Sequence, residues 1–145
     1  MKLPILIAVD FDETIVYSHP FPKIKRLKKG AKKYINKLYQ EGFYITIWTC
    51  RTDKDACKDA SDAIDFLNTN GINFHGMNEN HYALSKAFGN NCRKIAVDMY
   101  VDDKGLWLFG IPSWFWLYRI IKFKSFFLKE KRKILSHCKP EHFKS

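Results

Sequence analysis

The chain has 145 residues, of which 46% are hydrophobic, and a formal net charge of +10. This length fits one domain with its own core, and this apolar content excludes a disordered chain. The four cysteines form no CxxC pair and no disulfide framework, which favours a reducing compartment and argues against a zinc site. The first apolar run is interrupted by Asp10, too early for a signal peptide, so we expect a cytoplasmic protein.

Strands and helices alternate along the predicted chain, with short connections between them. In chain order the patterns predict a strand at 4–9, a loop at 17–25, a helix at 28–41, a strand at 43–48, a helix at 53–70, a short strand at 72–74, a helix at 81–88 and a strand at 95–101. This alternation is typical of a parallel sheet covered on both faces. The sequence therefore predicts an α/β fold, a Rossmann-like three-layer sandwich with a mainly parallel central sheet.

The tail differs in composition from the rest of the chain. Residues 106–128 are rich in Trp, Phe, Leu and Ile but contain three cations, which excludes a spanning helix. Residues 115–135 fit an amphipathic helix, whose packing on the sheet is favoured over a membrane-surface helix, a dimer contact or a nucleic-acid arm. We therefore expect a core over residues 1–114 and a basic, aromatic helical extension over 115–145.

The positive charge is concentrated in two segments. From Arg119 onward the chain has nine Lys or Arg residues and two Glu, a net charge of +7. Between residues 23 and 37 it has eight Lys or Arg residues and no acid. Such segments attract nucleic acid, anionic lipid or a phosphorylated substrate, and they equally serve as solvated faces that keep a protein soluble.

Polar side chains follow three of the predicted strands. They are Asp10 and Asp12, Thr49 and Arg51, and Asp102 and Asp103. The carboxyl ends of parallel strands meet at one edge of a sheet, where ligands of such folds bind. Carboxylates brought together there need a partner, and a divalent cation is the usual one.

These positions resemble the motifs of the haloacid dehalogenase (HAD) superfamily of phosphatases. The matching residues are Asp10, Asp12 and Thr14 of a DxDxT signature, Thr49 at the end of a strand, Lys94, and the pair Asp102 and Asp103. The resemblance covers residues 5–114, and the segments 48–51, 93–103 and 110–114 are similar to small capless hydrolases of bacteria and phages. It implies a capless HAD core. The last thirty or so residues of this chain have no counterpart in that family.

The resemblance also implies a reaction. Asp10 would attack phosphorus to form an aspartyl-phosphate, and Asp12 would serve as general acid and then general base. Thr49 and Lys94 would bind the transferring phosphoryl group, with Thr14 and Arg51 on the substrate side. A Mg²⁺ ion would be held by Asp10, the backbone carbonyl of Asp12, and the pair Asp102 and Asp103.

Alternative roles remain open for several of these residues. Thr49 is also a good helix cap for the following helix. Lys86 competes for the role of the phosphate-binding lysine. Arg51 either clamps a phosphate group of the substrate or pairs with Asp53 or Asp55.

Two further residues bear on the site. Asp98 precedes Asp102 by four positions, too far down the strand for a metal, so we expect a structural role for it. Glu13 stands where the signature usually has Gly, and its side chain either points away from the site or adds negative charge to it.

No interval of the chain has room for a cap domain, so we expect an open site. An open site suits large phosphoesters, and the basic cluster near it favours a nucleotide or a nucleic-acid end as substrate. The leading function is a magnesium-dependent phosphate monoesterase. The alternative is a non-enzymatic binding module whose tail contacts a membrane or a protein partner, including a second copy.

Overall fold

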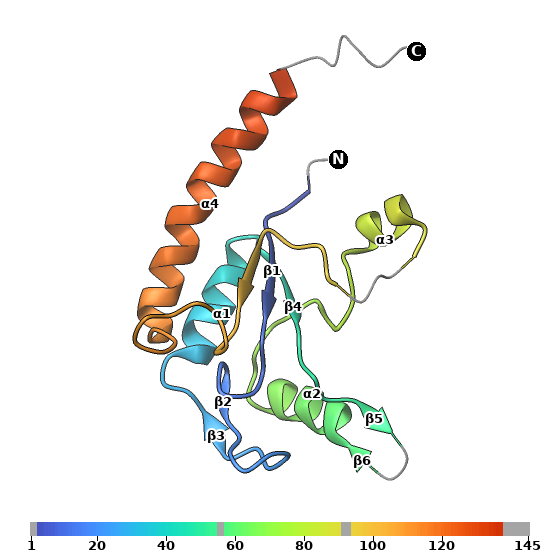
Figure 1. Cartoon of the computed structure of the whole chain (residues 1–145), viewed down its shortest axis with the longest axis vertical. Coiled ribbons are helices and arrows are strands. Elements are labelled where there is room, and N and C mark those ends of the chain that lie inside the picture. The colour runs from blue at the N-terminus through green and yellow to red at the C-terminus, as the bar shows by residue number, and fades with distance from the viewer. Residues whose placement is uncertain (1–2, 55–56, 91–93, 138–145) are drawn as a thin grey trace.

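The central element is a four-stranded parallel sheet in the order β7-β4-β1-β8, of which Figure 1 labels β1 and β4. Its strands are β1 (Leu6–Val9), β4 (Tyr44–Ile47), β7 (Gly76–Met77) and β8 (Met99–Val101). The structure is a computed structural model that describes residues 3–54, 57–90 and 94–137, with side chains up to residue 133. Because β1 lies between β4 and β8, the residues that follow β1, beginning with Asp10, lie beside the carboxyl ends of both neighbouring strands.

In the part of the chain that the structure describes, four helices and two short hairpins surround this sheet. The helices are α1 (Ala31–Gln40), α2 (Asp59–Thr69), α3 (Tyr82–Phe88) and α4 (Trp114–His137). One hairpin pairs β2 (Val16–Tyr17) with β3 (Arg26–Leu27), and the other pairs β5 (Asp53–Lys54) with β6 (Cys57–Lys58).

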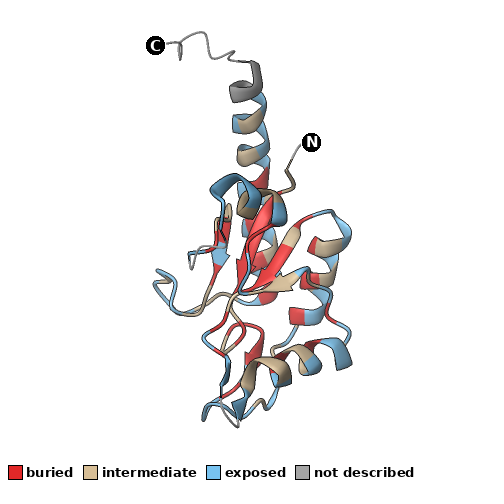
Figure 2. Cartoon of the chain, turned by 90° about the vertical axis from the view of Figure 1, so that its right-hand side faces the viewer, coloured by how far each residue is buried: buried red, intermediate tan, exposed pale blue. Residues whose placement is uncertain are grey.

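The main core lies on one face of the sheet. Alternate residues of a strand point to the same face of a sheet. The residues that point to the core face here are Ile7, Val9, Ile45, Ile47, Met99 and Val101. They form one buried cluster with apolar residues of α1, α2 and α4, and Figure 2 shows the buried residues concentrated around the central strands.

The other face of the sheet carries α3. The ring of Tyr44 on this face lies 4.7 Å from the ring of His81, whose side chain caps α3 by accepting from the Ala83 N–H. Helices therefore cover both faces, which confirms the predicted α/β three-layer fold.

Several predicted boundaries are wrong. The helix expected at 53–70 begins at Asp59, because the chain first forms the β5–β6 hairpin. Asp53 still caps α2 from that hairpin, since its carboxylate accepts from the N–H groups of Ala60 and Ser61, each at 3.0 Å. The short strand expected at 72–74 forms at Gly76–Met77, and the strand expected at 95–101 is regular only over its last three residues.

Helix α4 packs against α1 and contributes to the main core, whereas the sequence favoured packing on the sheet itself. Trp114, Leu117 and Ile121 are buried in the main core. Tyr118 and Lys122 also bond to the Glu41 carboxylate at the end of α1, at 2.8 and 3.0 Å. The first half of α4 is thus part of the core, and a domain boundary at residue 114 would cut the helix in its first turn.

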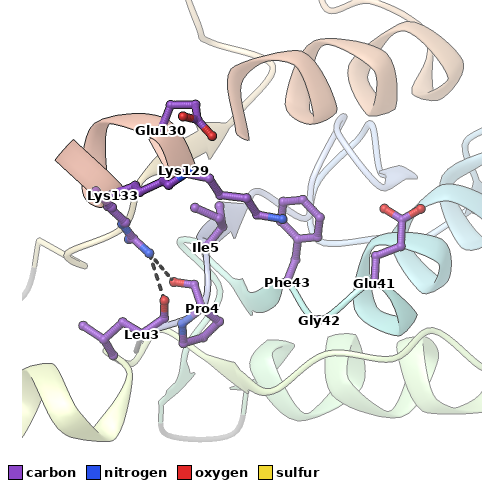
Figure 3. A pocket seen from close by; sticks show the side chains of 10 residues that line it. Leu3, Pro4, Ile5, Glu41, Gly42, Phe43, Lys129, Glu130 and Lys133 are labelled. Atoms are coloured by element: carbon purple, nitrogen blue, oxygen red, sulfur yellow. Dashed lines mark hydrogen bonds between the residues drawn. The ribbon is translucent and has the colours of Figure 1, made fainter. Parts of the chain in front are cut away.

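The distal half of α4 is fixed to the sheet by one arginine. The guanidinium of Arg132 donates to both carboxylate oxygens of Asp98 at 2.8 Å, and to the carbonyl oxygens of Leu3 and Pro4. Asp98 also accepts from the Leu6 N–H at 2.8 Å, which confirms the structural role expected for it. A pocket of about 460 Å³ lies beside this contact, between α4 and the amino ends of the strands (Figure 3).

Within the described residues, no helix combines the length and apolar character required to cross a membrane.

We predict that Arg132→Ala lowers the free energy of unfolding by about 1–2 kcal/mol, because it removes charged hydrogen bonds at a partly exposed site. Urea denaturation followed by circular dichroism measures this difference. The neighbouring exposed Lys131→Ala serves as control and should change stability little. Equal midpoints for the two variants would contradict the role of the Arg132 contact.

Candidate metal and phosphate site

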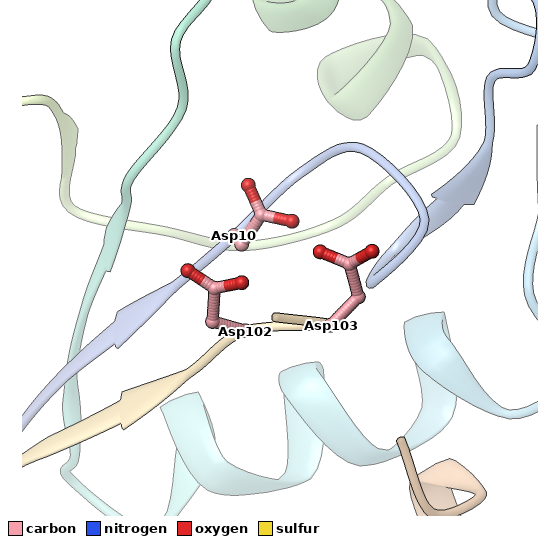
Figure 4. Close-up of side chains that lie close together, drawn as sticks. All are labelled: Asp10, Asp102 and Asp103. Atoms are coloured by element: carbon pink, nitrogen blue, oxygen red, sulfur yellow. The ribbon is translucent and has the colours of Figure 1, made fainter. Parts of the chain in front are cut away.

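Three carboxylates meet at the carboxyl edge of the sheet. Asp10 directly follows β1, and Asp102 and Asp103 directly follow β8. The two strand ends are held together by the Asp10 N–H, which donates to the Val101 carbonyl at 2.8 Å. One oxygen from each carboxylate lies within 4.8 Å of the others, and Figure 4 shows the three side chains around a common space.

Thr14 holds this cluster together from behind. Its hydroxyl donates to the Asp10 carboxylate at 2.9 Å and accepts from the Asp103 N–H at 3.0 Å. Its carbonyl accepts from the indole of Trp114 at 3.0 Å, and the residue is only 1% exposed. Thr14 therefore positions Asp10 and Asp103, and the substrate contact expected for it from the sequence stays a prediction for a residue that is buried here.

The Glu13 carboxylate is not a member of the cluster and bonds instead to the loop that follows β2. Its backbone has φ of +53°, a left-handed conformation that glycine adopts most easily. Its carboxylate accepts from the N–H groups of Ser18 and His19, at 2.7 and 3.2 Å. Lys28 donates to its carbonyl. Glu13 thus fixes the start of the β2–β3 loop. Its positive φ also explains why the DxDxT signature usually has Gly at this position.

Asp12 faces a buried arginine. The Nε and Nη2 atoms of Arg51 donate to its carboxylate at 3.0 and 2.7 Å, and the Thr49 hydroxyl lies 3.5 Å from it. Arg51 is 1% exposed, with its guanidinium over the rings of Phe11 and Phe21. The Asp12 side chain is not a member of the three-carboxylate cluster.

These contacts decide two of the open alternatives. The partner of Arg51 is Asp12 and not Asp53, whose carboxylate caps α2, while Asp55 lies outside the described residues. Thr49 does not cap α2, because the residue at the cap position is Lys58. Instead its hydroxyl accepts from the Arg51 N–H at 3.2 Å, so Thr49 helps to orient the Asp12–Arg51 pair.

A shallow hollow of about 330 Å³ opens over the cluster. Its lining consists of the acidic residues Asp10, Asp12, Glu13, Asp102 and Asp103, the loop residues Ser18, His19 and Phe21, and Cys50 and Lys104. The Lys104 ammonium lies 2.9 Å from the Asp103 carboxylate. Sequence reasoning missed Lys104, although its place directly after the Asp pair was a usable signal.

Neither lysine proposed from the sequence reaches this hollow. Lys94 is exposed and lines a separate surface hollow with Phe88 and Tyr100. Because β8 runs parallel to β1, residues that precede β8 lie toward the amino ends of the strands, away from Asp10. Lys86 is exposed on α3. The assignment of either as the phosphate-binding lysine does not fit this geometry.

The electrostatics of the cluster favour a cation. The pKa of Asp10 is raised from 3.8 to about 7, and burial is the largest cause. The hydrogen bond from Thr14 lowers the pKa, and the charges of Asp102, Asp103 and Asp12 add to the rise. Three hard oxygen donors at this spacing fit Mg²⁺ better than a softer metal. The residues present therefore fit a divalent cation, held by Asp10, Asp102 and Asp103.

The fold and site define an α/β protein with a carboxylate cluster at the carboxyl edge of its sheet. The chain matches no family model and no curated protein. Among solved structures it is similar to a conserved protein coded by a locus of Bacteroides thetaiotaomicron, with a TM-score of 0.70 and 30% identity over 84% of this chain and 93% of that one. The chain belongs to the same family as that protein, whose description states no activity.

The raised pKa of Asp10 predicts a pH-dependent stability without metal. Because the carboxyl group loses its proton less readily in the fold than in the unfolded chain, the fold loses stability as pH rises from about 4 to about 7. Asp10→Asn should therefore raise the free energy of unfolding by about 1–3 kcal/mol at pH 8 in EDTA, and by nearly nothing near pH 4. Denaturation across this pH range measures the difference. A pH-independent effect would contradict the electrostatic origin.

The conformation of Glu13 predicts an unusual order of stabilities. Glu13→Gly loses the carboxylate contacts but gains a residue suited to positive φ, whereas Glu13→Ala loses the contacts and keeps the strain. We expect Ala to be less stable than Gly by about 1 kcal/mol in thermal or urea denaturation. Equal stability of the two variants would show that the backbone is not strained at this position.

Proposed function

We propose that this protein is a magnesium-dependent phosphohydrolase that cleaves a phosphate monoester through an aspartyl-phosphate on Asp10. The convergence of Asp10 with Asp102 and Asp103 within 4.8 Å, in an open hollow that Asp12 also lines, carries this proposal. It agrees with the resemblance of the motif residues to HAD phosphatases.

The chain's own residues would divide the reaction between them. Asp10, ionised, attacks phosphorus as the ester P–O bond breaks, and Asp12 gives a proton to the leaving oxygen. Asp12 then takes a proton from the water that attacks phosphorus and releases Asp10. A bound Mg²⁺ would supply positive charge that lets an anionic nucleophile approach an anionic substrate.

Arg51 and Thr49 would act on Asp12 and not directly on the substrate. The guanidinium fork bonds to both oxygens of Asp12 and so fixes the orientation of the carboxylate. Lys104 is exposed at the rim of the hollow, beside Asp103. Its ammonium group would bind phosphate oxygens of the substrate.

The test is hydrolysis of a generic aryl phosphate with Mg²⁺ and with EDTA. We expect turnover with Mg²⁺ only, and losses of at least about 100-fold for Asp10→Asn and Asp12→Asn. Asp65→Asn, an exposed carboxylate on α2, is the matched control and should keep full activity. Metal-independent turnover, or full activity of Asp10→Asn, would reject the proposed mechanism. Absence of turnover under all conditions would leave the non-enzymatic binding module.

A nucleotide or nucleic-acid end is the substrate class that the surroundings of the hollow support best. The β2–β3 loop contributes Ser18, His19 and Phe21 to the lining, and the same loop carries Lys23 and Lys25. Cations at the rim of an open site suit a substrate with more than one phosphate. Cleavage of a 3′-phosphorylated oligonucleotide that weakens as salt rises would agree; activity without salt dependence would exclude a polyanionic substrate.

We also propose a cytoplasmic location. Cys50 and Cys57 are both exposed free thiols, which is the state expected in a reducing compartment. Fractionation of cells that express the full chain would test this, with recovery outside the reducing compartments as the contrary result.

A further inference from the structure

Helix α4 has two apolar sides, and the described residues cover only one of them. Trp114, Leu117 and Ile121 pack into the main core. At 100° per residue, a second stripe is centred about 120° around the helix from these residues, and its members are 44–69% exposed. The stripe consists of Trp116, Ile120, Phe123 and Phe127, and we call it the α4 stripe. Apolar side chains in this number rarely stand in water without a partner.

The loop before α4 adds a second exposed apolar group. Leu106, Leu108 and Phe109 are 93–106% exposed, and this loop lies at the foot of α4 (Figure 1). The loop is anchored, because the Trp107 indole donates to the Asp102 carbonyl at 2.8 Å. Gly105 permits that contact, since a Cβ at this position would lie 2.7 Å from the indole nitrogen.

The charges around the α4 stripe favour an anionic partner. Along α4 there are seven Lys or Arg residues and one Glu. The helical spacing sets Lys124 and Lys131 along one border of the stripe and Arg119 along the other. Aromatic side chains bordered by cations are typical of helices that lie in the interface of an anionic membrane.

We propose that the α4 stripe, together with the loop at 106–109, docks on an anionic lipid surface. A second copy of the chain fits this surface poorly, because two such helices would bring like charges together. A nucleic acid would use aromatic rings and cations but would leave the exposed Ile120, Leu106 and Leu108 without a role. A lipid interface accepts aliphatic and aromatic side chains alike, while its headgroups meet the flanking cations.

The test is flotation of the full chain with vesicles of phosphatidylcholine alone or mixed with phosphatidylserine. We expect binding to the mixed vesicles only, weakening as salt rises. The double variant Phe123→Ser, Phe127→Ser should bind the mixed vesicles at least about tenfold less tightly. The double variant Lys124→Gln, Lys131→Gln should lose about fivefold in vesicle affinity for each charge removed. Both pairs are exposed, so circular dichroism should show an unchanged fold.

Matched changes on α3 control for general effects. Phe88→Ser and Lys86→Gln alter an exposed aromatic residue and an exposed cation away from α4, and should bind vesicles as the unchanged chain does. Asp10→Asn should also bind normally, because the docking does not depend on the proposed reaction.

Three results would overturn the proposal. The first is absent binding, or equal binding to both kinds of vesicle. The second is a dimer in sedimentation that Phe123→Ser, Phe127→Ser dissolves, which would assign the stripe to a second copy. The third is oligonucleotide binding that the same variant removes while vesicle binding persists.

Discussion

The mutual repulsion of Asp10, Asp102 and Asp103 is the constraint on which the site depends. Unit charges 4.8 Å apart, the upper limit of the separations here, repel by about 3.5 kcal/mol per pair at the effective dielectric of a protein surface. The fold sustains this because β1 and β8 are hydrogen-bonded neighbours, and because the hydroxyl of Thr14 bonds to both Asp10 and the backbone of Asp103. Such an arrangement is unfavourable alone and becomes favourable once a cation is shared, which is the basis of the proposed metal dependence.

The same cluster is coupled to the tail of the chain. Trp114 opens α4 and bonds to the carbonyl of Thr14, so the helix begins directly behind the site. At its distal end Arg132 bonds to Asp98 and to the chain before β1. The helix is therefore tied to both edges of the sheet, and its uncovered stripe is held in a fixed orientation. The proposed docking surface and the proposed reaction centre are thus connected through the same helix.

Much of this architecture could be predicted from the sequence because it depends on local patterns. Continuous apolar runs marked β1 and β4, and polar residues at their ends marked the edge where Asp10 and Asp102 meet. The pairing of Arg51 with Asp12 could not be predicted, because it joins residues 39 positions apart and competed with the nearer Asp53 and Asp55. The role of Glu13 needed a backbone angle, and the place of Lys94 needed the lining of the hollow, to which it does not belong.

The account is tested most directly by a crystal structure of the protein with Mg²⁺ and fluoroberyllate, a mimic of a transferring phosphoryl group. It predicts an octahedral ion contacted by the carboxylates of Asp10 and Asp102, with beryllium bonded to an Asp10 oxygen and Asp12 facing the mimic. An ion bound elsewhere, or fluoroberyllate absent from Asp10 while the ion is present, would contradict a nucleophilic role for this aspartate.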